Sequence, residues 1–238
     1  MNSIYKDILI AKKQQKRLLA VLLDPDKLLA KDVAKIVYKI NESHATHIFV
    51  GGSTVANGET ETLVVEIKKH TSLPVVLFPG NFNQVTYKAD AILFLSLLSG
   101  RNPEYLIEQQ IKAAPYLREI NLEIIPTGYV LVNGGVETAV QKVSRTVPIE
   151  QENTELITNT ALAGEYLGKK LIYLEAGSGA IQTVRIKNIS SVAKALSIPL
   201  IVGGGIRSQQ QMQLAYDAGA DLVVIGTAFE NDSTFFEK

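Results

Sequence analysis

Apolar and amphipathic segments alternate along the whole chain. Eight nearly continuous apolar runs of five to seven residues occur at 18–23, 47–51, 74–80, 91–95, 122–128, 171–175, 199–205 and 221–226. Runs without polar alternation are typical of parallel strands that helices cover on the outside. The repeated strand–helix pattern therefore predicts an α/β fold with a parallel sheet.

Helical periodicity is visible between several of these runs. Two apolar stripes have the period of about 3.6 residues that marks an amphipathic helix, and they consist of Leu29, Val33, Ile36, Val37 and Ile40, and of Ile189, Val192, Ala193 and Leu196. Asn102 followed by Pro103 is typical of a helix cap and a first helical turn. A further helix is expected near Asn153–Tyr166.

The number of runs favours a closed (β/α)8 barrel, the TIM barrel, over an open doubly wound sheet. The chain has 238 residues, and α/β barrels of about 200–250 residues commonly form one domain. We therefore expect residues 1–238 to form a single TIM-barrel domain.

The spacing of the runs is abnormal at two places. Only residues 81–90 separate the third run from the fourth, whereas a parallel crossover with its helix needs about 10–12 residues or more. We therefore expect a modified barrel in which the third helix is missing. Residues 129–170 are in excess and contain the turn signal Asn133-Gly134-Gly135. An insertion of this kind is expected to form a lid or an oligomer contact.

The composition excludes several classes of protein. The absence of cysteine excludes a disulfide scaffold, a thiolate zinc site and a cysteine nucleophile. The 24 basic residues balance the 24 acidic ones, which argues against nucleic-acid binding because that needs a basic face. The N-terminal segment does not have the pattern of a secretory signal, and no apolar run approaches the length of about 20 residues that spans a bilayer. We therefore expect a cytoplasmic protein.

Glycine is concentrated at the ends of the last two runs, in IVGGGIRS (201–208) and VVIGTAF (223–229). Active sites of TIM barrels lie at the C-terminal ends of the strands, and a phosphate site after strands 7 and 8 recurs in them. Glycine lets backbone N–H groups approach an anion, and a following helix N-terminus adds its positive end. The two segments predict a phosphate site; the alternative is that their glycines only make tight turns.

The segment YLEAGSGA (173–180) carries the second candidate site. Because side chains alternate along a strand, Tyr173 and Glu175 point the same way, while Leu174 points to the helices. Glu175 ends its strand at the barrel mouth, where a carboxylate can act as a base toward a hydroxyl. The loop Gly177–Gly179 could wrap a polar ligand. The alternatives are a structural ion pair for Glu175 and barrel packing for Tyr173.

The segment LLDPDK (22–27) carries the third candidate site. Asp24 ends the first strand, and Mg²⁺ prefers one or two carboxylates together with substrate phosphate oxygens. Ser53, after the second run, could meet the same metal or a diphosphate on it. The alternatives are a cap or turn role for Asp24, a cap of the following helix for Asp26, and an N-cap role for Ser53.

These segments resemble the geranylgeranylglyceryl phosphate synthase family, which includes the heptaprenylglyceryl phosphate synthases. The matching pieces are spread in order over nearly the whole chain: LLDPDK, IFVGGST, LFPGN, SLLSGRNPEYLI, IIPTGY, YLEAGSGA, IVGGGIRS and VVIGTAF. The segments SGRNPEYLI and PTGYVLV resemble the archaeal and Bacteroidetes-type branch more than the Firmicutes branch. The family is described as a modified barrel without the third helix.

The resemblance implies a prenyl transfer. The C3 hydroxyl of sn-glycerol 1-phosphate would attack C1 of a long prenyl diphosphate, geranylgeranyl diphosphate being the expected one, and diphosphate would leave. The residues implied are Glu175 and Tyr173 for catalysis, and Asp24 and Ser53 for Mg²⁺. Those implied for glycerol phosphate are Tyr173, Leu174, Glu175, Ala176, Gly177, Ser178, Gly179, Gly204, Gly205, Gly226 and Thr227. The family also implies a homo-oligomer, either a dimer or a hexamer, and its lipid product is compatible with transient contact with a membrane surface.

Two other classes remain open at the level of the residues. One is a phosphosugar isomerase or a flavin mononucleotide enzyme that uses the same phosphate site. The other is a catalytically silent barrel that binds a phosphorylated metabolite or a lipid. No lysine or histidine ends a strand, which argues against a Schiff-base aldolase, and the first strand lacks the G-x-G-x-x-G of a dinucleotide site.

Overall fold

Eight parallel strands close into a barrel in the order in which they occur along the chain. The structure is a computed structural model, and it describes residues 3–226. The strands are β1 (Leu18–Leu23), β2 (His47–Val50), β3 (Val75–Leu77), β4 (Ala91–Leu97), β5 (Glu123–Leu131), β6 (Leu171–Glu175), β7 (Leu200–Gly203) and β8 (Leu222–Ile225). The pairing of β1 with β8 closes the ring, with Leu18 opposite Leu222. The predicted TIM barrel is confirmed.

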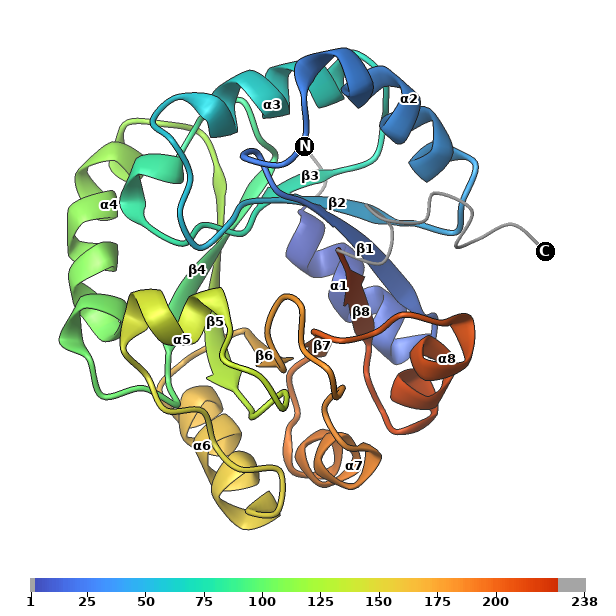
Figure 1. Cartoon of the computed structure of the whole chain (residues 1–238), viewed down its shortest axis with the longest axis vertical. Coiled ribbons are helices and arrows are strands. Elements are labelled where there is room, and N and C mark those ends of the chain that lie inside the picture. Colours follow the sequence, from blue (N-terminus) through green and yellow to red (C-terminus); the bar gives the residue numbers. More distant parts are fainter. Residues whose placement is uncertain (1–2, 227–238) are drawn as a thin grey trace.

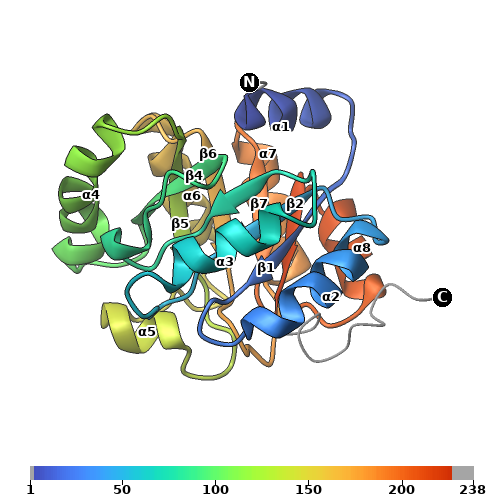
Figure 2. The same ribbon diagram turned by 90° about the horizontal axis from the view of Figure 1, so that it is seen from above.

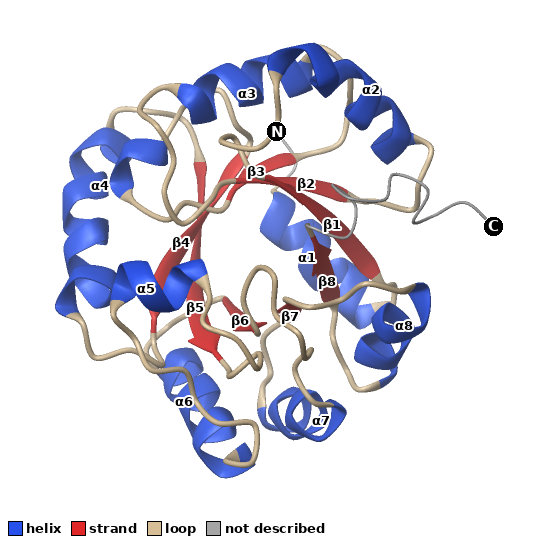
Figure 3. Cartoon of the chain, in the orientation of Figure 1, coloured by secondary structure: helices blue, strands red, loops and turns tan. Residues whose placement is uncertain are grey.

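Helices surround this ring of strands or cover its two ends (Figures 1 and 3). They are α1 (Ile4–Lys13), α2 (Ala30–Asn41), α3 (Glu59–Lys68), α4 (Gln109–Arg118), α5 (Ala139–Ser144), α6 (Thr154–Tyr166), α7 (Ile186–Ala195) and α8 (Gln209–Asp217). The predicted cap before α4 is present, because the Asn102 side chain accepts from the N–H of Glu104. A π-helical turn at Glu104–Glu108 then leads into α4. Within residues 3–226, no helix is both long and apolar enough to cross a membrane.

Two apolar cores explain why the strands are apolar on both faces. Side chains that point into the barrel form one core, which includes Phe49, Leu93, Tyr129 and Tyr173. Side chains that point outward form a second core against the surrounding helices. A strand buried on both sides has no polar face, so its sequence reads as a continuous apolar run.

The predicted gap in the helical layer is present between β3 and β4. Only a short 3₁₀ turn at Phe82–Gln84 occupies this connection. Its Phe82 ring stacks on Tyr116 of α4, with the ring centroids 6.3 Å apart. The missing helix thus leaves a short turn and the flank of α4 beside the outer edge of β4.

Helix α1 covers the N-terminal end of the barrel, and α5 lies at the opposite end (Figure 2). The Glu123 carboxylate, at the start of β5, accepts hydrogen bonds from Ser3 Oγ and from the N–H groups of Ile4 and Tyr5. These bonds satisfy N–H groups that the first turn of a helix leaves free. Because α1 covers the N-terminal end of the barrel, a site is expected at the opposite end, where the strands finish.

Candidate functional site

A cavity of about 430 Å³ opens at the C-terminal ends of the strands. Loops after β1, β2, β3, β6, β7 and β8 line it, and side chains of α4 and α5 extend the lining beside β4. Its volume lies in the range of about 300–1,000 Å³ that is common for small-molecule sites. The cavity is therefore where the candidate residues have to meet.

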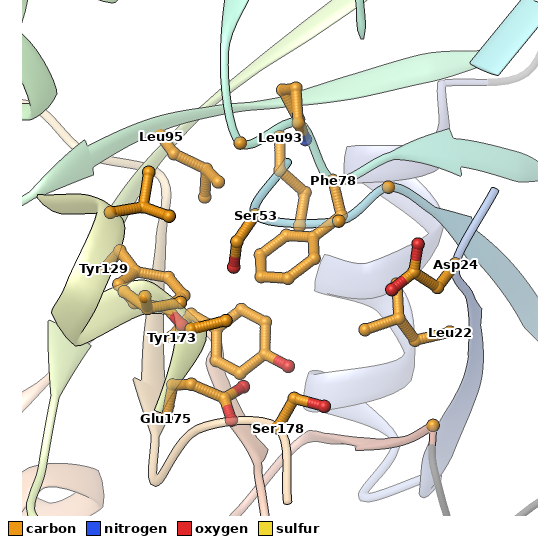
Figure 4. A pocket seen from close by; sticks show the side chains of 18 of the residues that line it. Leu22, Asp24, Ser53, Phe78, Leu93, Leu95, Tyr129, Tyr173, Glu175 and Ser178 are labelled. Atoms are coloured by element: carbon orange, nitrogen blue, oxygen red, sulfur yellow. The ribbon is translucent and has the colours of Figure 1, made fainter. Parts of the chain in front are cut away.

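Tyr173 and Glu175 project from the same face of β6 into this cavity (Figure 4). Gly203 of the neighbouring strand makes room for both. A Cβ atom there would overlap the Tyr173 hydroxyl and lie 2.9 Å from Glu175 Oε2. One glycine of the triple-glycine segment thus admits two side chains, a role that neither the phosphate nor the tight-turn interpretation included.

Glu175 is 5% exposed, and it has no ion pair within residues 3–226. The described residues therefore give no support to the interpretation of Glu175 as a structural ion-pair partner. Burial raises the pKa of its carboxyl group to about 7, although the Tyr173 hydroxyl and the Gly177 N–H partly oppose this rise. The Gly177 N–H donates to Glu175 Oε1 at 2.7 Å. A carboxylate with a pKa near the working pH is well matched to a general base.

The Tyr173 hydroxyl is buried and has no hydrogen-bond partner of good geometry among the described residues. The hydroxyl lies beside the Glu175 carboxylate and lowers the pKa of that group, but it makes no well-aligned hydrogen bond. A ligand oxygen in the cavity could provide one, and buried polar groups are favoured when they are hydrogen-bonded. The hydroxyl therefore points to a polar ligand beside Glu175.

The loops after β6 and β7 pack backbone against backbone. Gly204 has a φ of +84°, and a Cβ atom there would overlap Glu175 Oε1 and lie 2.6 Å from Gly177 N. The Arg207 guanidinium donates to Ala180 O at 2.6 Å and ties the two loops together. This arrangement presents closely spaced backbone groups around Glu175, as an anion site made of glycine loops requires.

Asp24 lies against the loop after β2, because a Cβ atom on Gly52 would be 2.8 Å from Asp24 Oδ1. The same oxygen accepts from Asp26 N at 3.1 Å, and Oδ2 is 3.3 Å from Lys27 Nζ. The turn role expected for Asp24 as an alternative is therefore present, and it leaves the carboxylate in the cavity lining.

The alternative roles for Asp26 and Ser53 as helix caps are wrong. Helix α2 is preceded by Leu29, with no side-chain cap, because Asp26 Oδ1 instead accepts from Ala56 N at 3.2 Å. Helix α3 begins at Glu59 after Gly58, which leaves Ser53 outside it. Ser53 lines the cavity.

Asp24 and Ser53 are donor types that suit a magnesium ion held in part by substrate. No group of three or more His, Cys, Asp or Glu side chains that could hold a metal occurs in the part of the chain that the structure describes. Asp24 and Ser53 would supply one carboxylate and one hydroxyl from facing loops. Mg²⁺ is commonly bound by one or two carboxylates, with substrate phosphate oxygens completing its shell.

Three aromatic rings lie at the centre of the cavity (Figure 4). The centroid of Phe78 lies 5.2 Å from that of Tyr173 and 5.9 Å from that of Tyr129. The centroids of the two tyrosine rings are 5.5 Å apart. These distances are within the range of about 4.5–7 Å for favourable aromatic pairs, so the rings support one another.

The cavity extends from these rings toward the gap left by the missing helix. This extension is mostly apolar and is lined by Phe82, Val85, Ile92, Leu93, Phe94, Leu95, Tyr105, Ala113, Val140 and Val143. One end of the cavity therefore holds Glu175 and the glycine loops, and the other end is suited to an apolar chain.

A model of the PcrB family matches residues 11–238. The chain belongs to this family. A relative from Flavobacterium johnsoniae, named geranylgeranylglyceryl phosphate synthase, is 57% identical over 238 residues, covering 100% of this chain and 98% of its own length. A relative of the same name from Pyrococcus furiosus is 44% identical, covering 95% and 90% of the two chains. The resemblance to the family and its archaeal and Bacteroidetes members is confirmed.

Solved structures of this PcrB-family type have the same fold. The (S)-3-O-geranylgeranylglyceryl phosphate synthase from Thermoplasma acidophilum, in complex with its substrate sn-glycerol-1-phosphate, has a TM-score of 0.94 and 33% identity, covering 100% of this chain and 95% of that chain. An aldolase from Escherichia coli, 14% identical with a TM-score of 0.57 over 97% and 82% of the two chains, shares the fold alone.

The cavity of this PcrB-family chain brings together most of the candidate residues. Those that line it are Asp24, Ser53, Tyr173, Glu175, Ser178, Gly179, Gly204, Gly205 and Gly226. Leu174 and Ala176 belong to the outer core, so only their backbone is available to a ligand at the mouth. Gly177 packs against Thr138. Thr227 lies outside the described residues.

Several lining residues were not predicted from the sequence of this PcrB-family chain. Phe78 and Tyr129 line the cavity. Phe78 lies within the run 74–80, directly after β3 ends at Leu77, and Tyr129 directly follows the run 122–128, because β5 extends to Leu131. Helix α5 was also missed. Its Thr138–Gln141 capping box is a signal that the sequence carries. Because α5 lines the cavity, the excess segment 129–170 contributes to the site, and its role as a lid or an oligomer contact stays a prediction.

Proposed function

We propose that the chain is a magnesium-dependent prenyltransferase of the geranylgeranylglyceryl phosphate synthase type. It would join the C3 hydroxyl of sn-glycerol 1-phosphate to C1 of a long prenyl diphosphate, expected to be geranylgeranyl diphosphate, and release diphosphate. The observation that carries the proposal is the buried Glu175 between two glycine loops, with its pKa raised to about 7 by burial. The names of the relatives and the substrate in the Thermoplasma structure support it.

The glycine loops after β6, β7 and β8 would hold the phosphate of glycerol phosphate. Fixing the phosphate there orients the C3 hydroxyl toward Glu175, and such positioning removes much of the entropic cost of bringing two reactants together. The Tyr173 hydroxyl, which has no hydrogen bond of good geometry among the described residues, would bond a glycerol oxygen and hold this orientation.

Glu175 would accept the proton of the C3 hydroxyl while the hydroxyl oxygen forms a bond to C1 of the prenyl group. The bond between C1 and the diphosphate oxygen breaks in the same process, and its electrons leave with diphosphate. When bound at Asp24 and Ser53, Mg²⁺ would neutralise charge that develops on the leaving group. The aromatic rings at the centre of the cavity would shield C1 from water.

The apolar extension of the cavity would hold the prenyl chain. It lies beside the connection between β3 and β4, where only a short 3₁₀ turn takes the place of a helix, and this leaves room for the chain. Each buried methylene contributes about 0.8 kcal/mol to binding, so a long apolar tail needs a lined groove of this kind.

The test is incubation with sn-glycerol 1-phosphate, Mg²⁺ and prenyl diphosphates of several lengths, followed by the mass of the product. The sn-glycerol 3-phosphate isomer is the stereochemical control. Glu175→Gln should bind glycerol phosphate nearly as wild type and lose turnover. Unchanged turnover in this variant removes Glu175 as the base, and binding without any product favours the silent barrel.

The expectations of a homo-oligomer and of a cytoplasmic location stay predictions. Sedimentation of the purified chain distinguishes a monomer from a dimer or a hexamer. Fractionation of cells separates a protein that remains in the cytosol from one that associates with membranes.

A further inference from the structure

The loops after β2 and β3 touch through their backbones. A Cβ atom on Gly51 would overlap the Phe78 carbonyl oxygen. A Cβ atom on Gly80 would overlap Gly52 O and lie 2.7 Å from Ser53 O. Glycine is therefore required at both positions, and the place of Ser53 depends on how these two loops are held.

Few strand hydrogen bonds hold these loops. The pairing of β2 with β3 ends at Val50 and Leu77, and the last backbone bond between them runs from Phe78 N to Val50 O at 2.8 Å. No regular helix follows β3 to support its loop. Something other than the strand ladder must fix Gly52 and Ser53.

The side-chain amide of Gln84 bridges the two loops. Its Oε1 accepts from Gly80 N at 3.2 Å and from Gly52 N at 3.4 Å. Its Nε2 donates to Gly52 O at 2.8 Å. Gln84 is 2% exposed and is the last residue of the turn that replaces the missing helix. The amide thus pairs with the β2 loop much as a strand would.

Gln84 is absent from the cavity lining, whereas Gly52, Ser53 and Gly80 belong to it. It can act on a ligand only through the loops that it holds. Ser53 points into the cavity from the β2 side, whereas Glu175 and Ser178 come from the β6 side (Figure 4). Gln84 therefore supports one half of the site.

We propose that Gln84 is a positioning residue for the diphosphate and metal half of the site, which it serves by bridging Gly52 and Gly80 and thereby placing Ser53. This inference rests on the proposed function. Residues that orient a metal ligand without touching the metal typically change affinity or activity by about 10–100-fold when they are replaced.

The test is Gln84→Met, which keeps the length of the side chain and removes all its hydrogen bonds. Calorimetry measures the affinity for inorganic pyrophosphate in the presence of Mg²⁺ and, separately, for sn-glycerol 1-phosphate. We expect the pyrophosphate affinity to fall by about 10–100-fold, with a parallel rise in KM for the prenyl diphosphate. The glycerol phosphate affinity should remain that of the wild type, which also shows that the variant is folded.

Gln151→Met is the matched control. Gln151 is 3% exposed and bridges Asn133 O and Thr183 O on the other side of the mouth. The Gln151→Met variant should have a lower melting temperature than the wild type, without a selective loss of pyrophosphate affinity. If Gln84→Met does not fold, Gln84→Asn, which is one methylene too short for the bridge, takes its place.

A double variant that carries both Gln84→Met and Ser53→Ala tests whether Gln84 acts through Ser53. If Gln84 acts through Ser53, the two substitutions together should weaken pyrophosphate binding by less than the product of their separate effects. An equal loss of affinity for both ligands, additive effects, or no loss overturns the inference. A wild-type chain that forms no prenyl product overturns the proposed function, whereas an active wild type with an unaffected Gln84 variant overturns only the role of Gln84.

Discussion

Replacing Glu175 by Gln should make the folded chain more stable at alkaline pH while it removes turnover. Burial raises the pKa of the carboxyl group from 4.5 to about 7. At about 1.4 kcal/mol for each pH unit, this rise corresponds to a penalty of about 3 kcal/mol for the ionised form. A neutral amide of the same shape does not carry this penalty, and its oxygen can still accept from Gly177 N.

The penalty has a defined pH window. Between pH 4.5 and about 7 the unfolded chain releases the Glu175 proton while the folded chain retains it, so this group lowers stability progressively as the pH rises. Below this window both states are protonated and the penalty is absent. Above it the penalty is complete, and the difference between wild type and variant is largest.

Thermal unfolding at pH 5 and pH 8 measures the effect. For a domain of this size, Tm shifts by about 2–4 °C for each kcal/mol of unfolding free energy. Glu175→Gln should therefore raise Tm by several degrees at pH 8 and by little at pH 5. Glu152→Gln, at an exposed carboxylate paired with Arg185, is the control and should not give this pattern. An equal Tm for wild type and Glu175→Gln at pH 8 would refute the account of burial.

Three further changes probe the site and the fold, and a pH profile tests the base. In the wild type, kcat/KM should fall about tenfold per pH unit below the Glu175 pKa of about 7, because the base must be ionised; a flat profile between pH 5 and pH 8 contradicts this. Gly204→Ala forces a side chain into a φ of +84° and onto Glu175, so the KM for glycerol phosphate should rise and Tm should fall. An unchanged KM would show that the loop adapts. Glu123→Ala should cost about 0.5–2 kcal/mol in urea unfolding, comparable to the loss of a cap, with kcat retained, since the first turn of α1 loses the hydrogen bonds that this carboxylate accepts from Ile4 N and Tyr5 N. Val85→Trp should shift the preference toward shorter prenyl diphosphates in a competition assay. An unaltered product length would show that the prenyl group does not bind beside Val85.

Local sequence patterns predicted the strands closely. The run 91–95 became β4 at Ala91–Leu97, and 171–175 is β6 itself. Continuous apolarity is a property of neighbouring residues, and a strand buried on both sides displays it directly. The missing third helix was also predictable, because ten residues lie at the lower limit for a crossover with its helix.

Helix α5 shows where local reasoning was incomplete. Its six residues are too few to display a convincing apolar stripe, and the length of the surrounding segment indicates only an insertion that forms a lid or an oligomer contact. The role of Gly203 shows the same limit, since the side chains that it admits come from another strand. Contacts of this kind join residues about thirty positions apart, and no periodicity connects them.

The sequence by itself determined the barrel, the gap after β3 and the set of residues at the strand ends, because these depend on local apolarity and chain length. The tertiary structure decided which of those residues share one cavity and what each side chain can do there. Burial of Glu175 among Tyr173, Gly203 and Gly204 raises its pKa, and the amide of Gln84 joins two loops whose own strand pairing has ended. Both effects arise from desolvation and from hydrogen bonds across the fold, which act only once distant segments are in contact.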